Sequence, residues 1–523
     1  MKGSPDGETM KLQEQMDRVI EQFKKLQPSE ESVKKQHKAG KLTARERIEL
    51  LTDRDTFEEI DYFMESIPLK FGKEDVHRRQ SVITGSAFIE GRRVFLYAHD
   101  FTVEGGSVGE REARKICKVQ DIALQNGKPF IGINDSAGAR IKEGVRNFTY
   151  TNVFVRNVMA SGVIPQIFAI VGPCAGGAVY SPALGDFIFM VDEIGQMFLT
   201  GPAVIKAVTG ETVTKNDLGG SNVHTRISGV AHFYTKSETD CFEGIKRLLS
   251  YIPDSNRDKP PYKDLGDDPN RREEGLLHIL PEEPQKYYDM LEIIRLVVDR
   301  SEFLEVQSRF ARNIVVGFAR LGGMSIGLVA SQPKFLAGCL DVDASIKAAQ
   351  FIRFCDAFGI PIISLVDVPG YLPGKDQEYY GIIRHGAKML YAFMEATVPK
   401  ITLIIRKAYG GGIAGMNCNK ERSADELLAW PSAEIAAVGP EGAVDLFYEE
   451  EIKAAQDPER RREELIRDFR ENVTSPYSLA ALGRIEKIID PRDTRKELYR
   501  ALMKHKDKVE ARLPWRKHGL IPL

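Results

Sequence analysis

The chain repeats itself at a nearly constant interval, and this internal repeat limits the folds that it can adopt. At an offset of 232 residues, six identical residues recur. The pairs are Gly85 and Gly317, Gly91 and Gly323, Gly127 and Gly359, Pro129 and Pro361, Asp135 and Asp367, and Gly138 and Gly370. The offset grows to 234 where Gly176-Gly177 match Gly410-Gly411, as insertions in loops would produce. The repeat predicts two domains of the same fold.

Both halves show the same order of predicted elements, which is a hairpin, a helix and then two buried strands. In the first half these elements are 81–87, 93–98, 110–126, 129–134 and 165–171. In the second half they are 314–319, 325–330, 343–358, 361–366 and 399–405. Strands that alternate with helices indicate a parallel sheet. We therefore predict an α/β fold made of two tandem domains related by internal duplication.

A proline-rich and charged segment separates the two halves. Residues 253–274 have little periodicity, which is typical of a linker. We therefore place the domain boundary near residue 265, between domains 1–265 and 266–523.

Helical patterns flank the repeats. Apolar residues within 10–23 have helical spacing, and Thr43-Ala44-Arg45-Glu46 has the pattern of a capping box at the start of a second helix. Residues 449–470 and 493–508 have the pattern of charged amphipathic helices. We interpret the N-terminal elements as packing elements.

Composition excludes several classes of function. The chain has 73 Lys and Arg against 75 Asp and Glu, and this balance argues against a nucleic-acid surface. It has no run of 18 apolar residues and its polar start lacks a signal-peptide core, so we predict a cytoplasmic protein without membrane insertion. The six cysteines include no Cys-x-x-Cys pair, and the nine histidines show no metal-ligand spacing. No metal site is therefore predicted.

Glycine clusters follow an apolar strand in each half and precede a plausible helix. They are residues 172–177 and 410–412. Glycine lets main-chain amides approach a ligand closely, and the free amides at a helix start carry the positive end of its dipole. A second loop, 135–139 or 367–370, ends the adjacent strand. Two such loops can donate two amides to one oxygen, as in an oxyanion hole.

Two other motifs fit this chain less well. Residues 105–109 match the nucleophile-elbow pattern, but the stretch 99–106 separates the serine from the strand end. Residues 410–415 match a dinucleotide-binding fingerprint, but the first half keeps only Gly176-Gly177. No side-chain base or nucleophile stands out, which indicates that a reactant supplies the base. Carboxybiotin meets this requirement, because losing carbon dioxide leaves a urea anion, while an acyl thioester that loses its α-proton becomes an enolate.

Seven longer motifs carry a family resemblance. They are DSAGARI at 135–141, GPCAGGAVYSP at 172–182, SGVAH at 228–232, DVDASIKAA at 341–349, DVPGYLPG at 367–374, RKAYGG at 406–411 and AWPSAE at 429–434. Through them the chain resembles, from about residue 10 to its end, the carboxyltransferase subunit of biotin-dependent acyl-CoA carboxylases of the propionyl-CoA carboxylase beta type. This family is built of two crotonase-like (ββα-repeat) domains.

The resemblance implies that the first domain binds the acyl-CoA and the second binds biotin, with the active site formed where the domains meet across a subunit interface. The residues that would hold the thioester enolate oxygen are Gly176, Gly177, Ala137 and Gly138. Those that would hold the biotin urea oxygen are Gly410, Gly411, Val368 and Gly370. Further expected substrate-binding positions are Arg140, Tyr371, Gly412, Ile413 and Ala414.

The resemblance also implies partners. The chain has neither a methionine-lysine-methionine biotinylation site nor an ATP-grasp-like segment. We therefore expect biotin carboxylase and the biotin carrier to be separate chains. Subunits of this family commonly form hexamers, so a homohexamer is expected.

One departure from the family bears on the substrate. Propionyl members usually continue the glycine turn as Gly-Gly-Ala-Tyr-Asp-Val-Met, whereas this chain has Ile413 and Ala414 at the Tyr and Asp positions. The Asp position is associated in the family with the choice of acyl chain. Because the smaller side chains leave more apolar room, we predict tolerance of longer or branched acyl groups.

Other functions stay open at this point. The same site run in reverse would be a decarboxylase or a transcarboxylase, because both directions need the same two oxyanions. A crotonase-type hydratase or isomerase would need an acidic pair near the first hole, for which Glu143 is the nearest candidate. A noncatalytic subunit that binds partners is a third class.

Overall fold

The chain divides into two compact units. The computed structural model describes residues 5–66, 79–283, 286–420, 423–510 and 518–523. The first unit comprises Met1–His224 and Tyr234–Lys246, and the second comprises Thr225–Phe233 and Arg247–Leu523. This division lies upstream of residue 265, and the binding roles of domains 1–265 and 266–523 stay predictions.

The first unit contains an eight-stranded mixed sheet with the order β1-β2-β3-β4-β5-β6-β8, and β7 pairs with β5. The strands are β1 Glu58–Glu59, β2 Val82–Ile89, β3 Arg92–His99, β4 Phe130–Ser136, β5 Gln166–Ala175, β6 Phe187–Val191, β7 Gln196–Phe198 and β8 Phe233–Thr235. Strands β1 to β3 pair antiparallel, and β3 to β6 pair parallel. Every residue of β4 is buried, as is typical of a parallel strand with both faces covered.

The second unit contains an eight-stranded sheet with the order β16-β14-β13-β12-β11-β10-β9, and β15 pairs with β13. The strands are β9 Phe303–Val306, β10 Ile314–Leu321, β11 Met324–Ser331, β12 Ile362–Val368, β13 Lys400–Tyr409, β14 Glu426–Ala429, β15 Glu434–Ala436 and β16 Lys487–Ile488. A hairpin, β10–β11, is again followed by parallel strands, β12 and β13. The predicted duplicated α/β architecture is confirmed.

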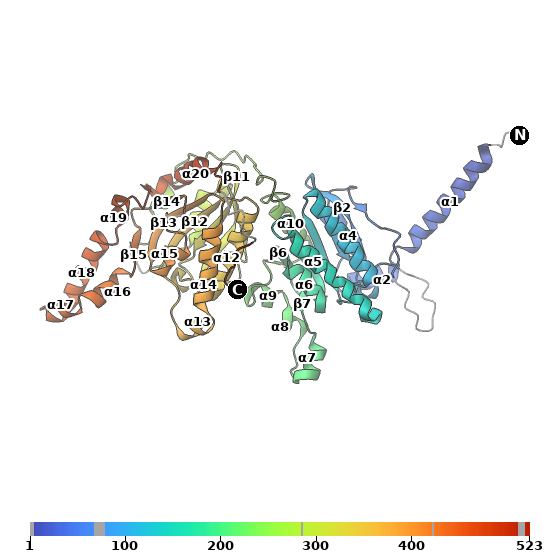
Figure 1. Cartoon of the computed structure of the whole chain (residues 1–523), viewed down its shortest axis with the longest axis horizontal. Coiled ribbons are helices and arrows are strands. Elements are labelled where there is room, and N and C mark those ends of the chain that lie inside the picture. Colours follow the sequence, from blue (N-terminus) through green and yellow to red (C-terminus); the bar gives the residue numbers. More distant parts are fainter. Residues whose placement is uncertain (1–4, 67–78, 284–285, 421–422, 511–517) are drawn as a thin grey trace. The chain divides into compact units, whose positions relative to one another are not determined.

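Helices cover the sheets of both units. The helices that begin in the first unit are α1 Pro5–Lys25, α2 Glu30–Lys38, α3 Ala44–Leu51, α4 Glu110–Asn126, α5 Thr151–Ala160, α6 Tyr180–Ala183, α7 Pro202–Thr209, α8 Lys215–Gly219, α9 Ser221–Arg226 and α10 Glu238–Leu249. Those of the second are α11 Met290–Val297, α12 Val342–Ala357, α13 Lys375–Tyr379, α14 Ile382–Glu395, α15 Gly411–Gly415, α16 Pro440–Phe447, α17 Glu449–Ala454, α18 Pro458–Asn472, α19 Pro476–Ala481 and α20 Thr494–His505. Helices α4 and α5 pack together, as do α12 and α14 (Figure 1). Within the described ranges, no helix has both the length and the apolar character needed to cross a membrane.

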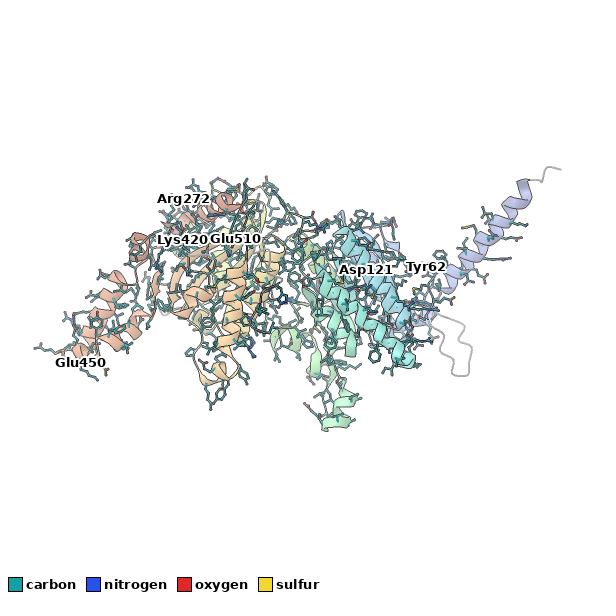
Figure 2. The ribbon with its side chains drawn as sticks, in the orientation of Figure 1. Tyr62, Asp121, Arg272, Lys420, Glu450 and Glu510 are labelled. Carbon is teal, nitrogen blue, oxygen red and sulfur yellow. The ribbon has the colours of Figure 1, made fainter. Side chains whose placement is uncertain are left out.

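Local sequence signals explain where several helices begin and end. The predicted capping box at α3 is present, because the Glu46 N–H donates to Thr43 Oγ1 and the Thr43 N–H donates to Glu46 Oε2. The predicted helical region 449–470 is interrupted. Helix α17, which carries Glu450 (Figure 2), ends at Ala454, and α18 starts at Pro458 with Asp457 as its N-cap. Proline suits a first helical turn, where its missing N–H has no intrahelical acceptor.

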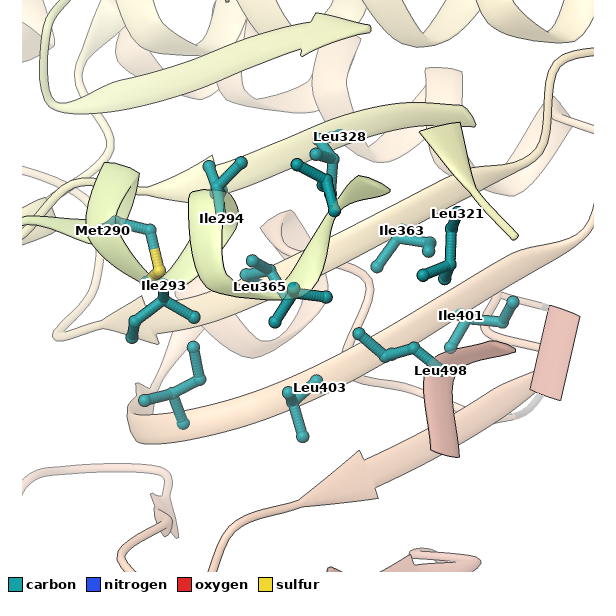
Figure 3. Packing of buried hydrophobic residues seen from close by; sticks show 14 of the residues in the cluster. Met290, Ile293, Ile294, Leu321, Leu328, Ile363, Leu365, Ile401, Leu403 and Leu498 are labelled. Atoms are coloured by element: carbon teal, nitrogen blue, oxygen red, sulfur yellow. The ribbon is translucent and has the colours of Figure 1, made fainter. Parts of the chain in front are cut away.

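The core of the second unit lies between its sheet and helices α11 and α20 (Figure 3). Side chains at alternate positions of β13 point to this core, because successive residues of a strand face opposite sides. Residues labelled in Figure 3 are Met290, Ile293, Ile294, Leu321, Leu328, Ile363, Leu365, Ile401, Leu403 and Leu498. This packing holds the carboxyl ends of β12 and β13 together, where the second glycine turn begins.

Candidate active site

The first glycine turn follows β5, which ends at Ala175. Gly176 has a φ of 60°, a left-handed conformation that favours glycine, and begins a short 3-10 helix, Gly176–Val179. A side chain at Gly177 would meet nothing nearer than a Tyr150 ring carbon at 4.0 Å. Packing alone therefore does not require glycine at 177. The open space leaves the amide N–H at this helix start approachable by a ligand.

The neighbouring loop follows β4 and contacts this turn. A Cβ placed on Gly138 would lie 2.5 Å from the Ala175 oxygen, so the two loops meet as expected. The amides of the loop are engaged, however. The Ala137 N–H donates to the Gly105 oxygen at 2.9 Å, and the Gly138 N–H donates to Ser136 Oγ at 3.0 Å. Ala137 is therefore not a free donor in this conformation, and Gly138 is one only if the serine hydroxyl releases it.

The second glycine turn follows β13 and repeats the geometry of the first. Gly410 has a φ of 52° and its N–H donates to the Ala436 oxygen at 2.9 Å, which closes the turn onto β15. Helix α15 then begins at Gly411, which is exposed. The first N–H groups of a helix have no intrahelical acceptor. Of the predicted donor pair, Gly410 thus uses its N–H within the fold, whereas the N–H groups of Gly411 and of the next residue, Gly412, stand at the start of α15.

The loop after β12 lies against this second turn. A Cβ on Gly412 would lie 3.0 Å from both Val368 methyl carbons and 3.3 Å from the Gly370 Cα, so the structure brings these three residues together. Val368 corresponds to Ser136 of the first unit, and its side chain cannot accept a hydrogen bond. Within the described part of the chain, the Gly370 N–H has no hydrogen-bond partner. Gly370 is thus available as a further donor.

Tyr371 packs beneath the second turn. Its ring carbon Cδ2 lies 3.1 Å from the Cβ position of Gly411, and its hydroxyl oxygen lies 2.9 Å from that of Gly415. The hydroxyl donates to the Gly386 oxygen at 3.4 Å. Burial raises the pKa of Tyr371 to about 12, so the phenol stays neutral near pH 7. This predicted substrate-binding residue forms the floor of the turn.

Arg140, a predicted substrate-binding residue, has a buried side chain that does not face open space, and its role at the substrate stays a prediction. Its guanidinium is buried, with Nη2 2.9 Å from Glu112 Oε1 and Nη1 3.1 Å from Glu143 Oε1, and it also donates to the Ser107 oxygen. Glu143 in turn accepts the Glu110 N–H at the start of α4. Both carboxylates are held by fixed partners. Arg140 therefore shapes the loop, and Glu143 is not a free general base.

Ile413 and Ala414 are half-buried in α15. The Ile413 N–H donates to the Gly410 oxygen at 3.2 Å, which closes the first turn of this helix, and its oxygen accepts the Cys418 N–H. The two residues therefore lie in the second unit and directly follow Gly411 and Gly412 in α15.

Sequence patterns did not identify the charged groups that hold the two loops. Asp135 and Asp367 were recognised as a repeated pair, but the roles of Lys41, Arg47 and Arg406 were not. Lys41 and Arg47 bind Asp135 across 94 and 88 residues of chain. No local periodicity reports such distant contacts. The only available signal was the position of each aspartate at a strand end next to glycine.

The whole-chain comparison is decisive. A family model described as the carboxyl transferase domain matches residues 35–521. The chain belongs to the carboxyl transferase family. The matched region of this carboxyl transferase includes both glycine turns and both adjoining loops. It also includes Lys41 and Arg47.

Relatives match this carboxyl transferase over almost its full length. The propionyl-CoA carboxylase carboxyltransferase subunit of Haloferax mediterranei is 53% identical over 496 residues, which are 94% of this chain and 96% of that protein. The methylmalonyl-CoA decarboxylase subunit alpha of Veillonella parvula is 49% identical over 516 residues, 98% of this chain and 99% of that protein. A crystal structure of transcarboxylase 12S, a hexamer with methylmalonyl-CoA and methylmalonic acid bound, is 46% identical with a TM-score of 0.92 and covers 100% of this chain and 99% of that one. The predicted family and fold are confirmed.

Proposed function

We propose that the chain transfers a carboxyl group between carboxybiotin on a separate carrier protein and the α- or vinylogous carbon of an acyl-CoA. The observation that carries this proposal is the duplicated glycine turn. In each unit a short helix has an approachable amide in its first turn, which is that of Gly177, the second residue of the 3-10 helix, in the first unit and that of Gly411, the first residue of α15, in the second. A reaction that develops one oxyanion on each of two reactants needs two such sites.

In the first unit we assign the thioester enolate oxygen to the Gly177 N–H, with Gly138 as the second donor. Gly138 becomes available when the Ser136 hydroxyl, which accepts its N–H at 3.0 Å, gives way to the ligand. The Ala137 N–H keeps its bond to Gly105 and holds the loop. Gly176 contributes the left-handed turn that precedes Gly177.

In the second unit we assign the biotin urea oxygen to the amides of Gly411 and Gly412, with Gly370 beside them. These are all N–H donors, which suits a carbonyl oxygen that gains negative charge. Biotin supplies the carboxyl group and the base when its carrier is bound. The protein's part is to hold the urea oxygen in place and to keep the Tyr371 ring beneath it.

The engagement of Glu143 supports carboxyl transfer over hydration or isomerisation. A crotonase-type hydratase needs carboxylates that are free to move protons near the first turn. Glu143 is fixed by Arg140 and by the amide of Glu110. A carboxyl transfer in which the reactant itself supplies the base does not need such a group.

The proposal covers both directions of transfer, because carboxylation and decarboxylation develop the same two oxyanions. We further propose a biotin carboxylase and a biotin carrier as separate partner chains, and assembly into a homohexamer. The hexameric state of the similar transcarboxylase 12S supports this. So does an apolar surface on the 3-10 segment Ile141–Tyr150, where Ile141, Val145 and Phe148 are 88%, 79% and 72% exposed. The cytoplasmic location stays a prediction.

The test is to mix the purified chain with a biotinylated carrier, its biotin carboxylase, ATP and labelled bicarbonate, and to follow label onto acetyl-, propionyl-, butyryl- and branched acyl-CoA. We expect label in a carboxylated thioester only when all components are present. A carrier proven active with another carboxyltransferase serves as control. Failure to label any thioester from that carrier, or hydratase activity without biotin, would overturn the proposal.

A further inference from the structure

Two buried aspartates occupy the same position in the two units. Asp135 is the next-to-last residue of β4, and Asp367 is the next-to-last residue of β12. Their exposed fractions are 0% and 1%. A buried carboxylate needs compensating charge or hydrogen bonds, because burial strongly disfavours its ionised form. The source of that compensation differs between the units.

In the second unit the compensation comes from the adjacent strand. Arg406 of β13 places Nε 3.0 Å from Asp367 Oδ2, and the Lys407 N–H donates to Oδ1 at 3.0 Å. The aspartate is thus held within the sheet that carries both the loop and the glycine turn. Arg406 itself also contacts residues outside the sheet, because its Nη1 donates to the Lys286 oxygen at 3.0 Å and its guanidinium lies 5.0 Å from the ring centre of Tyr288.

In the first unit the position that corresponds to Arg406 is Gly172. A Cβ there would lie 2.0 Å from Asp135 Oδ1, so the carboxylate occupies the space of the missing side chain. The strand cannot supply the counter-charge. Instead, Lys41 Nζ lies 2.7 Å from Asp135 Oδ1, and Arg47 Nη1 lies 2.9 Å from Oδ2.

The N-terminal segment 36–47 therefore reaches the strand end from outside the sheet. Gln36 Nε2 donates to Asp135 Oδ2 at 3.0 Å, and Arg47 Nη2 donates to the Val171 oxygen at 3.0 Å. Arg47 also pairs with Glu238 at 2.5 Å, and the Leu42 N–H donates to the same carboxylate. The segment thus contacts the strands that lead into both the loop and the turn.

Two further features concern the charge of Arg47 and the position of Lys41. Burial opposes the charge on Arg47, but the carboxylates of Asp135 and Glu238 outweigh it and raise its pKa. Lys41, whose pKa burial lowers, also lies 3.9 Å above the ring centre of Phe101. Phe101 is close to the Cβ position of Gly105, whose oxygen accepts the Ala137 N–H. The segment is thus linked to the start of the first loop through Asp135 and, through Phe101 and Gly105, to Ala137.

We infer that segment 36–47 is a positioning element for the first-unit loop alone, and that it sets the geometry of the acyl-CoA half of the reaction through Asp135. The part of this inference that concerns catalysis rests on the proposed function. The part that concerns the structure of the loop can be tested without it, by hydrogen exchange. Lys41 and Arg47 are positioning residues, since they act through Asp135 and reach the loop amides only indirectly.

The test compares Lys41→Met with the matched second-unit variant Arg406→Met and with Lys118→Met, which removes an exposed ion pair to Asp61. Hydrogen exchange of the backbone amides is measured for residues 136–140 and 368–372. We expect Lys41→Met to speed exchange in 136–140 by about tenfold or more and to leave 368–372 unchanged. Arg406→Met should do the reverse, and Lys118→Met should change neither segment.

Carboxyl transfer supplies the second readout. Lys41→Met should lower kcat by roughly 10- to 100-fold, as displacement of a positioned group does, with little change in KM for the biotinylated carrier. Lys41→Arg, which keeps the charge, should recover most of the rate. Gln36→Met is a milder change that tests the same loop if Lys41→Met does not fold.

The outcomes separate the two claims. Equal acceleration of exchange in both loops, or none in either, would overturn the inference. If the loop-specific exchange appears but the unmodified chain transfers no carboxyl group, the proposed function fails while the positioning role stands. If the exchange is loop-specific and the Lys41→Met loss falls on KM for the carrier, the assignment to the acyl-CoA half is wrong.

Discussion

Gly176 in the first unit and Gly410 in the second begin the same turn, with φ values of 60° and 52°. The loop glycines beside them, Gly138 and Gly370, also share a positive φ, at 100° and 143°. Such values favour glycine, since other residues lose stability there. The two units have therefore kept the backbone path at these four positions.

The side chains of the two loops have changed around that shared path. The position of Ser136 is taken by Val368, and that of Ala137 by Pro369. Proline has no N–H, so the hydrogen bond that Ala137 donates in the first unit has no counterpart in the second. The donors common to both units are the amides at the starts of the short helices. The amides of Gly177 and Gly411 are therefore the proposed donors that the two units share.

The largest effect is expected from removing the cations that compensate the two buried aspartates, Asp135 and Asp367. Arg47→Met should lower the free energy of unfolding by about 3–5 kcal/mol, because it leaves the buried carboxylates of Asp135 and Glu238 undercompensated. Arg406→Met should lower the free energy of unfolding by less than Arg47→Met does. Burial already raises the pKa of Asp367, so this carboxyl can bind a proton when its partner is lost.

Urea unfolding followed by circular dichroism measures both losses. Lys118→Met, at an exposed ion pair, is the control and should change stability by less than about 1 kcal/mol. Similar losses for Arg47→Met and Arg406→Met would show that the two aspartates are held equally well, contrary to the contrast drawn from the structure.

The second prediction removes a shared donor. Gly411→Pro deletes the N–H at the first position of α15, where proline is well tolerated. Gly411→Ala adds the same Cβ, 3.1 Å from a Tyr371 ring carbon, but keeps the N–H. We expect the proline variant to lose about 100- to 1,000-fold in kcat relative to the alanine variant, as loss of one oxyanion-hole donor does.

The same pair of substitutions at Gly177 tests the first unit. Here a Cβ has no neighbour closer than 4.0 Å, so Gly177→Ala should be nearly as active as the unmodified chain. Equal activity of the Pro and Ala variants at either glycine, in steady-state transfer assays, would exclude that amide as a donor.

Much of this architecture could be predicted from the sequence, because the signals for it are local. The strand predicted at 361–366 is β12, Ile362–Val368, and the helix predicted at 110–126 is α4, Glu110–Asn126. Apolar runs and periodicity set both. The glycine turns also lie where a strand gives way to a helix.

The hydrogen-bond partners of the predicted site residues could not be predicted, because they depend on contacts between residues that are distant in the sequence. Gly410 was expected to donate to a ligand, but its N–H is used by Ala436, which lies on another strand. The guanidinium of Arg140 is held by Glu112 of α4 and by Ser81, which directly precedes β2. Only the folded chain brings these partners together, so no local pattern in the sequence reports them.

The third prediction compares how one buried histidine in each unit makes the free energy of unfolding depend on pH. Among the described residues, His99 in the first unit and His232 in the second are buried histidines, and burial lowers the pKa of each to about 4. The unfolded chain binds a proton at each site below about pH 6.5. The folded chain does not do so until about pH 4. Stability therefore rises with pH across this window and is lost as pH falls through it.

Between pH 7 and pH 5 we expect each histidine to account for a loss of about 2 kcal/mol in the free energy of unfolding. His99→Leu and His232→Leu should each remove about half of the pH dependence that the double variant removes. Urea midpoints at the two pH values measure this. If either single variant leaves the dependence unchanged, that histidine is not buried in its neutral form.

The smallest expected effect concerns the helix after each turn, where the units differ in side-chain size. The position of Ala414 in α15 corresponds to Tyr180 in α6 of the first unit. The small side chains of Ile413 and Ala414 leave apolar room, so we expect butyryl- and branched acyl-CoA to be accepted alongside propionyl-CoA. Ala414→Asp should lower kcat/KM for butyryl-CoA about tenfold relative to propionyl-CoA, because a longer apolar chain must desolvate the new carboxylate. Ala414→Ser, similar in size but uncharged, should change this ratio little. A strict preference of the unmodified chain for propionyl-CoA, in the same kcat/KM series, would refute the size argument and remove α15 as the determinant of acyl choice.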